Sequence, residues 1–199
     1  MEKQVLITVS REFGSGGHEV AAELAKRFGL PLYDESILDS IAHKHNLKLD
    51  KLSRFDESPI NIFTSRRVRG FSNSPEEHVA AMQSAFLRQK ADAGESFVVL
   101  GRCGEEYLRD YPGLVSIFVL ADRDFKQQRT MRIDKVSAEE ALELMSRNDK
   151  RRKYCHNQIC QAKWGDSRTY DICVNSAKLD IRGTCDLLEA YVRARIAAL

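Results

Sequence analysis

The sequence contains no long hydrophobic run and no strong excess of charge of either sign. Its 31 Lys and Arg residues nearly balance 29 Asp and Glu residues, which leaves a formal net charge of +2 over 199 residues. This balance argues against a surface that coats a nucleic acid or a membrane. The first apolar run, residues 5–9, is too short for the core of a signal peptide, and no later run could span a bilayer. We therefore expect a cytoplasmic protein with neither a membrane nor a nucleic acid as its partner.

Cysteines in a number and spacing that suit a disulfide framework are also missing. The five cysteines are odd in number and scattered, so we expect thiols in a reducing compartment. Cys155, His156 and Cys160 lie close together in the sequence, but a closed zinc site needs a second pair of ligands at short spacing, and none follows. We expect no resident metal ion.

Short apolar runs alternate with helical patterns, which is typical of an α/β fold with a mostly parallel sheet. Strands are predicted at residues 5–9, 30–34, 96–102, 114–122 and 170–176, and a last helix at 183–199. We interpret residues 1–199 as one domain with two helical insertions. The core would comprise about 1–34, 94–146 and 168–199, with insertions at about 35–93 and 147–167.

The first predicted strand runs into a glycine-rich turn, "SREFGSGGHEV", and then into a helix. Glycines at positions 14, 16 and 17 let backbone N–H groups point toward an anion, and the helix N-terminus adds unsatisfied donors and the positive end of its dipole. A phosphate-binding loop and a purely structural turn both fit this stretch. A dinucleotide-binding turn is disfavoured because G-x-G-x-x-G is absent.

The phosphate-loop pattern G-x-x-x-x-G-K-[ST] is incomplete because its lysine is missing. Counting Gly17 as the second glycine places His18 at the lysine. Counting Gly16 instead places Arg11 at the first glycine and Gly17 at the lysine. In either count the hydroxyl that binds magnesium is displaced, and one of two nearby serines would have to supply it, Ser10 or Ser15.

Arginines stand where a phosphate site would need them. Arg102 follows the third predicted strand, at the sheet edge where ligands bind in open parallel sheets, and an arginine there can hold phosphate through two parallel hydrogen bonds. A surface ion pair with Glu105 or Glu106 is the alternative. Two basic runs, residues 64–70 and 146–153, are either solvated faces or lids that close over a polyphosphate.

Four stretches together, "SREFGSGGHEVAAELAKRFGLPLYDESIL", "VVLGRCGEEYLRD", "DKRRKY" and "YDICVNS", resemble the cytidylate kinase-like proteins, a branch of the nucleoside monophosphate kinases. The resemblance runs from residue 5 to about residue 191. It implies a three-layer α/β/α P-loop kinase fold with a five-stranded parallel sheet, a helical acceptor-binding insertion and an arginine-bearing lid. It also implies ATP and Mg²⁺ as cofactors.

The resemblance assigns site residues as well. Its phosphate loop would consist of Gly14, Ser15, Gly16, Gly17, His18 and Glu19, and the residues near the adenine would be Asn175 and Ser176. The residues at the reacting groups would be Asp34 on the acceptor side, Arg102 on the acceptor phosphate, and Arg151 and Arg152 in the lid, with Arg147 as a helper. Because the loop lysine is missing, Arg11, Arg102 or a lid arginine has to supply its charge.

These expectations describe a kinase that transfers the γ-phosphoryl group of ATP to a small acceptor, and a nucleoside monophosphate such as CMP or dCMP is the first choice. A hydroxyl compound is an alternative acceptor, since Asp34 could orient the attacking hydroxyl. A non-catalytic nucleotide-binding or regulatory module is the alternative from another class. A homo-oligomer is left open.

Overall fold

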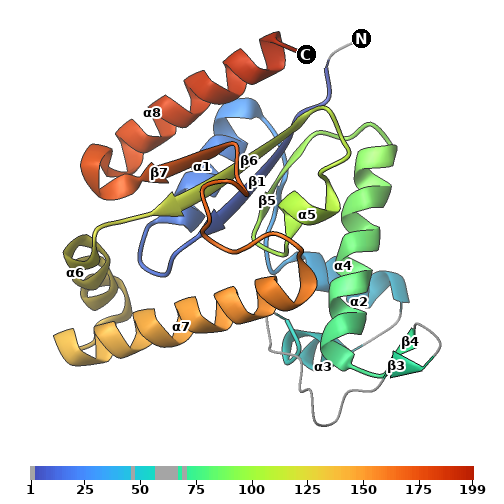
Figure 1. Ribbon diagram of the computed structural model, residues 1–199, viewed down its shortest axis with the longest axis horizontal. Helices are drawn as coiled ribbons and strands as arrows, with labels where there is room; N and C mark the ends of the chain where they lie inside the picture. Colours follow the sequence, from blue (N-terminus) through green and yellow to red (C-terminus); the bar gives the residue numbers. More distant parts are fainter. Residues whose placement is uncertain (1–2, 46–47, 57–66, 69–70) are drawn as a thin grey trace.

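Five parallel strands form the centre of the molecule, in the order β2-β5-β1-β6-β7 (Figure 1). The computed structural model describes residues 3–45, 48–56, 67–68 and 71–199. The strands of this sheet are β1 (Leu6–Arg11), β2 (Leu32–Tyr33), β5 (Phe97–Leu100), β6 (Leu114–Leu120) and β7 (Ile172–Asn175). All four neighbouring pairs are parallel, which confirms the predicted five-stranded parallel sheet.

Helices cover both faces of the sheet because its strands are apolar on both sides. On one face, Ile7 and Val9 pack with α1 (Gly17–Phe28) and α8 (Ser176–Ala197). On the other face, Leu6 and Phe97 pack with side chains of α2 (Ile37–His45), α3 (Leu49–Ser53) and α4 (Pro75–Asp92). The short helix α5 (Gly104–Tyr107) lies beside α4. The three-layer α/β/α arrangement is therefore confirmed.

Two further helices lie at the left and lower left in Figure 1, α6 (Arg123–Asp134) and α7 (Ala138–Ile159). They pack against each other. Ser137 begins α7 with a capping box, in which its hydroxyl accepts from the amide of Glu140 and the Glu140 carboxylate accepts from the amide of Ser137. The predicted lid, about 147–167, covers the second half of α7 and the segment that follows it, and its role as a lid stays a prediction.

The structure differs from the sequence-based expectation at two places. Two short antiparallel strands, β3 (Arg67–Val68) and β4 (Phe71–Ser72), lie where no strand was predicted, at the basic run 64–70. The other arginines of this run, Arg66 and Arg69, are outside the described residues. Helix α8 begins at Ser176 rather than at residue 183, because the Asn175 side chain caps it by accepting from the amide of Ala177. The helix is interrupted at Asp180, where φ is 54°.

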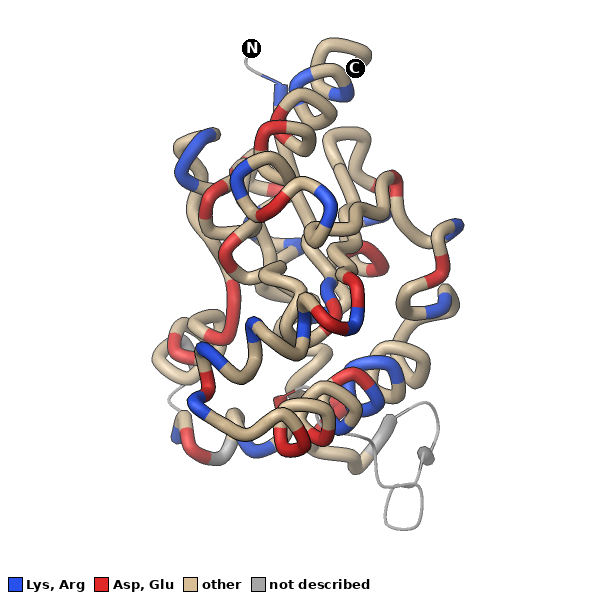
Figure 2. Tube along the Cα trace, turned by 90° about the vertical axis from the view of Figure 1, so that its left-hand side faces the viewer, with Lys and Arg blue, Asp and Glu red and all other residues tan. Residues whose placement is uncertain are grey.

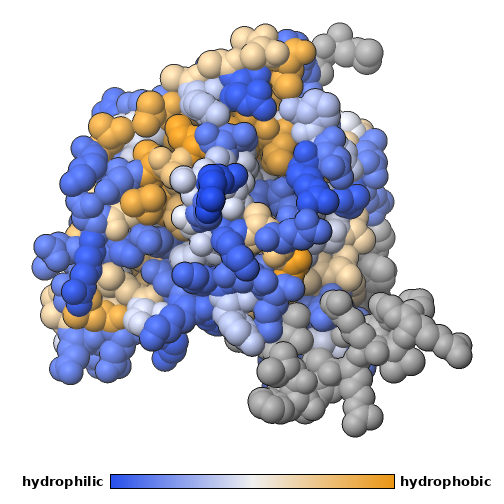
Figure 3. All heavy atoms as spheres, in the orientation of Figure 1, coloured by the Kyte–Doolittle hydropathy of each residue, from blue (hydrophilic) through white to orange (hydrophobic). Residues whose placement is uncertain are grey.

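The surface carries both signs of charge. Blue basic and red acidic segments are interspersed along the described part of the trace (Figure 2). Figure 3 shows a mostly hydrophilic face with apolar areas toward α8, where Leu179 and Leu187 are exposed. No helix in the described part of the chain has both the length and the apolar character that crossing a membrane requires.

The packing of α8 on the sheet generates a stability prediction. Leu188 is 0% exposed in the core between α8 and the sheet, whereas its neighbour Leu187 is 44% exposed. We expect Leu188→Ala to lower the free energy of unfolding by about 2–5 kcal/mol, because a cavity remains where the side chain was. Leu187→Ala is the matched control and should change it by less than about 0.5 kcal/mol. Urea denaturation measures both, and equal effects would contradict the packing.

Candidate active site

The turn between β1 and α1 has the shape of an anion-binding loop. Gly14 and Gly16 adopt positive φ angles of 78° and 79°, which residues with a side chain rarely adopt. A Cβ atom at Gly14 would lie 2.8 Å from Thr130 Oγ1 and 2.9 Å from the carbonyl oxygen of Lys126, so α6 closes one side of the loop. Gly16 caps α1, whose first turn presents backbone N–H groups and the positive end of the helix dipole.

Arg11 occupies the space into which a side chain at position 17 would project. A Cβ atom at Gly17 would lie 2.4 Å from Cβ and 2.9 Å from Cγ of Arg11. In the count that takes Gly16 as the second glycine of the phosphate-loop pattern, these two positions normally carry glycine at 11 and lysine at 17. In this count a basic residue stands at the glycine position and a glycine at the lysine position, and the structure brings the two positions into contact. Arg11 ends β1, and Gly17 begins α1.

His18 and Asp34 face each other across the mouth of the loop. His18 Nε2 lies 3.5 Å from Asp34 Oδ2, and the His18 side chain is 64% exposed. Burial raises the pKa of Asp34, but hydrogen bonds from Ser36 and the nearby His18 outweigh it and lower the pKa overall. Asp34 therefore presents an ionised carboxylate beside the loop. The next loop residue, Glu19, forms an ion pair with Arg129 of α6.

Side chains from α6 and α7 hold the loop from outside. Lys126 Nζ of α6 lies 2.9 Å from the Glu12 carboxylate and 3.6 Å from that of Asp149. Asp149 of α7 accepts a hydrogen bond of 2.6 Å from the amide of Phe13. Burial raises the pKa of Asp149, although the Phe13 amide and the charge of Lys126 act against it. The loop and the predicted lid helix are therefore connected through a half-buried carboxylate.

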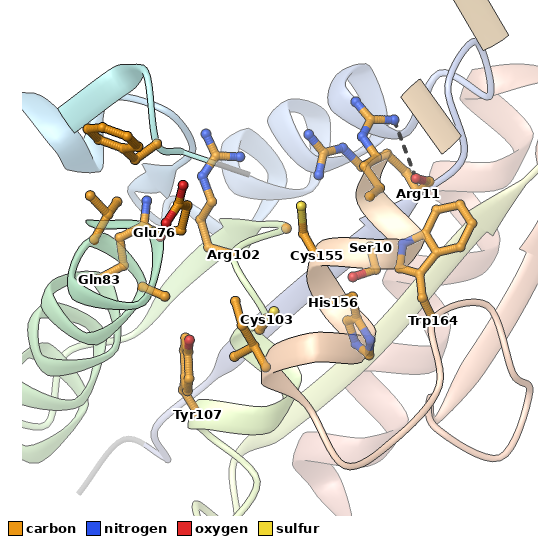
Figure 4. Close-up of a pocket in the computed structure, with 16 residues that line it drawn as sticks. Ser10, Arg11, Glu76, Gln83, Arg102, Cys103, Tyr107, Cys155, His156 and Trp164 are labelled. Atoms are coloured by element: carbon orange, nitrogen blue, oxygen red, sulfur yellow. Dashed lines mark hydrogen bonds between the residues drawn. The ribbon is translucent and has the colours of Figure 1, made fainter. Parts of the chain in front are cut away.

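Two cavities share part of their lining near the end of β1. The larger, the loop cavity, has a volume of about 490 Å³, and its lining includes Gly14, Gly16, Gly17, His18, Asp34 and Arg151. The smaller, the inner cavity, has a volume of about 50 Å³ and lies between α4, α5 and the C-terminal half of α7 (Figure 4). Three arginines line both cavities, Arg11, Arg102 and Arg152. A ligand in either cavity therefore meets the same group of positive charges.

Arg102 is buried and already carries a carboxylate partner. Its side chain is 5% exposed, and its Nη2 donates a 2.7 Å hydrogen bond to Asp56. Asp56 also accepts from Gln83 of α4 at 3.0 Å. Of the surface partners expected from the sequence, Glu105 is bonded to His156 and Glu106 to Arg109. An anion that binds Arg102 has to compete with Asp56.

The backbone around Arg102 is strained in a way that points to function. Gly101, Arg102 and Cys103 have φ angles of 70°, 58° and 53°, so three consecutive residues lie in the left-handed region. For two residues with side chains this conformation costs on the order of 1–3 kcal/mol each. Such strain persists where the surrounding structure demands it, and it is concentrated at active sites.

The arginines of the predicted lid differ in what they contact. Arg152 Nη1 lies 3.5 Å from the carbonyl oxygen of Arg11, and its guanidinium lies 5.8 Å from the centre of the Phe13 ring. The first of these contacts is the dashed line in Figure 4. Arg151 lines the loop cavity and donates to Asn148 at 3.2 Å. Arg147 is not among the residues that line either cavity.

Other residues assigned by resemblance have structural contacts. Ser15 is 0% exposed, and its hydroxyl donates to the carbonyl oxygen of Glu12 at 2.8 Å. Ser176 is also buried and donates to the carbonyl oxygen of Ser15 at 2.6 Å, which ties the start of α8 to the loop. The Asn175 amide donates to Asp122 at 2.7 Å. Neither cavity has Ser15, Asn175 or Ser176 in its lining, and their binding roles stay predictions.

The oxygen donors suit a magnesium ion that arrives with a nucleotide rather than one bound by protein alone. Magnesium prefers oxygen ligands and keeps several waters beside one or two carboxylates and phosphates. Glu12, Asp34 and Asp56 line the loop cavity with carboxylates. In the described part of the chain, no group of three or more His, Cys, Asp or Glu side chains is placed to hold a metal ion.

Three residues that hold the loop or Arg102 in place were not predicted from the sequence. They are Asp56, Lys126 and Asp149. Asp149 stands in the basic run 146–153, which was singled out for its arginines alone. Lys126 and Asp56 have no motif around them. Their contacts with Glu12 and Arg102 exist only because the fold brings α6 and the turn after α3 close to the candidate site.

The comparison with protein families agrees with the geometry. The cytidylate kinase-like family matches residues 6–178, which include the loop, Arg102 and the lid arginines. The chain belongs to this family. A protein of Eubacterium ventriosum described as uncharacterized is 38% identical, with a TM-score of 0.77, over 96% of this chain and 99% of that one. Among curated proteins, no relative matches the sequence.

More distant structures share the fold of this cytidylate kinase-like protein. A shikimate kinase from Bacteroides thetaiotaomicron is 13% identical, with a TM-score of 0.56, over 95% of this chain and 98% of that one. A sugar kinase from a Janibacter species is also 13% identical, with a TM-score of 0.53, over 98% and 95%. At these identities the likeness shows the P-loop kinase fold alone. Family and fold together support a phosphotransferase.

The contact between Arg11 and position 17 generates a prediction. We expect Gly17→Ala to lower the free energy of unfolding by about 1–3 kcal/mol, because the added Cβ overlaps that of Arg11. In an Arg11→Gly background the same substitution should cost little, so the two changes should couple by at least about 1 kcal/mol. A double-mutant cycle from chemical denaturation measures the coupling. Equal costs in both backgrounds would show that Arg11 does not occupy this space.

Proposed function

We propose that this protein is a Mg²⁺- and ATP-dependent kinase that phosphorylates a small acceptor bound beside Arg102. The observation that carries the proposal is the group of three arginines, Arg11, Arg102 and Arg152, at the junction of the two cavities. Phosphoryl transfer depends on positioning and on neutralising the charge of the phosphate oxygens. Arginines shared by a nucleotide site and an acceptor site meet both requirements.

Different residues of the chain would bind the phosphates, neutralise their charge and hold the magnesium ion. The amides of the loop from Gly14 to the start of α1 bind phosphate oxygens, and Arg11 provides the charge of the missing lysine. Arg151 and Arg152 reach the loop cavity from α7 and neutralise charge there. Bound Mg²⁺ supplies further charge neutralisation on the phosphates, and Asp34 and Glu12 are the carboxylates that would hold it.

The acceptor is proposed to be a nucleoside monophosphate such as CMP or dCMP. Its phosphate would replace Asp56 as the partner of Arg102, and an anionic acceptor needs no strong general base. A hydroxyl compound is the second candidate, favoured by the ion pair that Arg102 already makes with Asp56. In that case the Asp34 or Asp56 carboxylate would accept the hydroxyl proton. The names of the distant neighbours, a shikimate kinase and a sugar kinase, are a reason to test this second class as well.

Turnover with an acceptor panel tests this proposal. The panel comprises the common nucleoside monophosphates, shikimate and simple sugars, each incubated with protein and Mg-ATP, and ADP release is measured. We expect ADP only with a matching acceptor. Arg102→Ala should then lower kcat/KM by about 10- to 200-fold, the loss of a charge-assisted contact of about 1.5–3 kcal/mol. Arg109→Ala, at the 54% exposed side chain that pairs with Glu106, is the control.

The outcomes separate the candidates. Turnover with CMP or dCMP supports the first, and turnover with a hydroxyl compound alone supports the second. ATP binding without turnover on any acceptor favours a non-catalytic nucleotide-binding module. An unchanged rate in Arg102→Ala would show that this arginine does not meet the acceptor.

The role of Arg11 is tested by binding rather than turnover. At Mg-ATP concentrations a hundredfold above Kd, we expect stabilisation of about 2.7 kcal/mol in thermal unfolding. Arg11→Ala should remove most of this stabilisation, whereas Arg11→Lys should keep part of it because the charge remains. Arg193→Ala, a 58% exposed side chain of α8, is the control. Full stabilisation of the Arg11→Ala protein by Mg-ATP would assign the cation role elsewhere.

A further inference from the structure

A buried carboxylate behind the inner cavity, that of Glu105, connects several elements of the candidate site. The Glu105 side chain is 4% exposed and lies in α5. His156 Nε2 of α7 lies 2.8 Å from its Oε1, the Ser10 hydroxyl donates to its two oxygens at 3.3 and 3.4 Å, and the Tyr170 hydroxyl donates at 3.4 Å. One carboxylate thus connects β1, α5, α7 and the segment before β7.

On α7, the partner of Glu105 is one helical turn away from Arg152. His156 follows Arg152 at the spacing that places two side chains on the same face of a helix, and both side chains line the inner cavity. Arg102 lies in the turn that leads from β5 into α5, just before Glu105. The contact between His156 and Glu105 therefore fixes the distance between the two backbone segments that carry Arg102 and Arg152.

On β1, the partner of Glu105 is the residue next to Arg11. Ser10 is 4% exposed and lines the inner cavity, and Arg11 is the last residue of the strand. Figure 4 shows Ser10 and His156 on the same side of the inner cavity. Through Ser10 the carboxylate holds the end of the strand from which Arg11 projects. Each of the three arginines in the proposed function is therefore a short distance along the backbone from Glu105 or one of its partners.

The contact between His156 and Glu105 is an ion pair. Burial lowers the pKa of His156, but its contacts with Cys160 and Glu105 raise it overall to about 10, so the imidazole is protonated at neutral pH. A buried ion pair adds little stability compared with apolar side chains of similar volume, because the cost of desolvation offsets the attraction. Its hydrogen bonds are directional, however. The pair therefore contributes a defined geometry more than it contributes stability.

We propose that Glu105 is a positioning residue that holds the group of three arginines in the arrangement that binds phosphate. Like charges repel one another, so three guanidinium groups stay together only if the segments that carry them are fixed. Glu105 is not among the residues that line either cavity, and it acts through its hydrogen-bond partners rather than on a ligand. The inference rests on the proposed function, because it assumes that phosphates bind to these arginines.

Substitutions at Glu105 that differ in their ability to accept hydrogen bonds test the proposal. Glu105→Leu retains most of the volume and removes both acceptor oxygens, whereas Glu105→Gln retains one of them. With a matching acceptor, we expect Glu105→Leu to lower kcat/KM by about 100-fold, the effect of a misplacement of about 1 Å. Glu105→Gln should keep kcat/KM within about 10-fold of the unsubstituted protein, because its neutral hydrogen bonds are weaker than charge-assisted ones but still present.

Glu106→Leu is the matched control. Glu106 is the next residue of α5, and its carboxylate pairs with the exposed Arg109. We expect this variant to keep the kcat/KM of the unsubstituted protein. Urea denaturation shows that each variant is folded under the assay conditions. Equal activity of Glu105→Leu and Glu105→Gln, or a loss in Glu106→Leu as large as that in Glu105→Leu, would overturn the positioning role.

Ser10→Ala provides a second test that does not depend on the folding of Glu105→Leu. It removes the hydrogen bond between the carboxylate and β1, and we expect kcat/KM to fall by about 2- to 10-fold. Ser116→Ala is its control, because Ser116 is a buried serine of the neighbouring strand β6 that lines neither cavity. An unchanged kcat/KM in Ser10→Ala would overturn the proposal.

Binding of inorganic tripolyphosphate separates this inference from the proposed function, because it requires the arginines but no phosphoryl transfer. Isothermal titration calorimetry measures its Kd, and we expect Glu105→Leu to raise this Kd at least about 10-fold. Such a loss of binding upholds the positioning role even in a protein that phosphorylates no acceptor. Full turnover by Glu105→Leu refutes the positioning role and leaves the kinase established. An unsubstituted protein that neither binds tripolyphosphate nor turns over refutes both.

Discussion

The contact between Arg11 and Gly17 is the constraint on which the candidate site depends. The backbone must turn sharply from β1 into α1, and three glycines make that turn close against α6, α8 and the end of β1. No side chain fits at position 17 because Arg11 fills the space. The loop therefore keeps the backbone donors of a phosphate site, and in the proposed function Arg11 supplies the cation from the preceding strand. Phosphoryl transfer needs a positive charge beside the phosphate oxygens, whichever residue supplies it.

A second property of the site is that its charges are paired before any ligand binds. Arg102 is held by Asp56, and Lys126 by Glu12 and Asp149. Buried charges without partners are costly, so this pairing lets the fold hold several cations in one place. In the proposed function, phosphate groups of the ligand replace these carboxylates as partners of the cations. Binding is then an exchange of partners, and the displaced carboxylates would be available to a magnesium ion or an acceptor hydroxyl.

The sequence alone determined the fold class and the position of the loop. Strands that are buried on both faces appear in the sequence as continuous apolar runs, so local patterns predicted the parallel sheet. Glycines between a strand and a helix are typical of an anion site, so they indicated where the loop lies. It also left two counts of the loop open, because one-dimensional spacing cannot show which side chains share a space. Only the tertiary structure showed that the Arg11 side chain fills the space into which a side chain at position 17 would project. Likewise, Arg102 bonds to Asp56, 46 residues away in the sequence, and the Phe13 amide bonds to Asp149, 136 residues away. Only the packing of the chain brings these residues together.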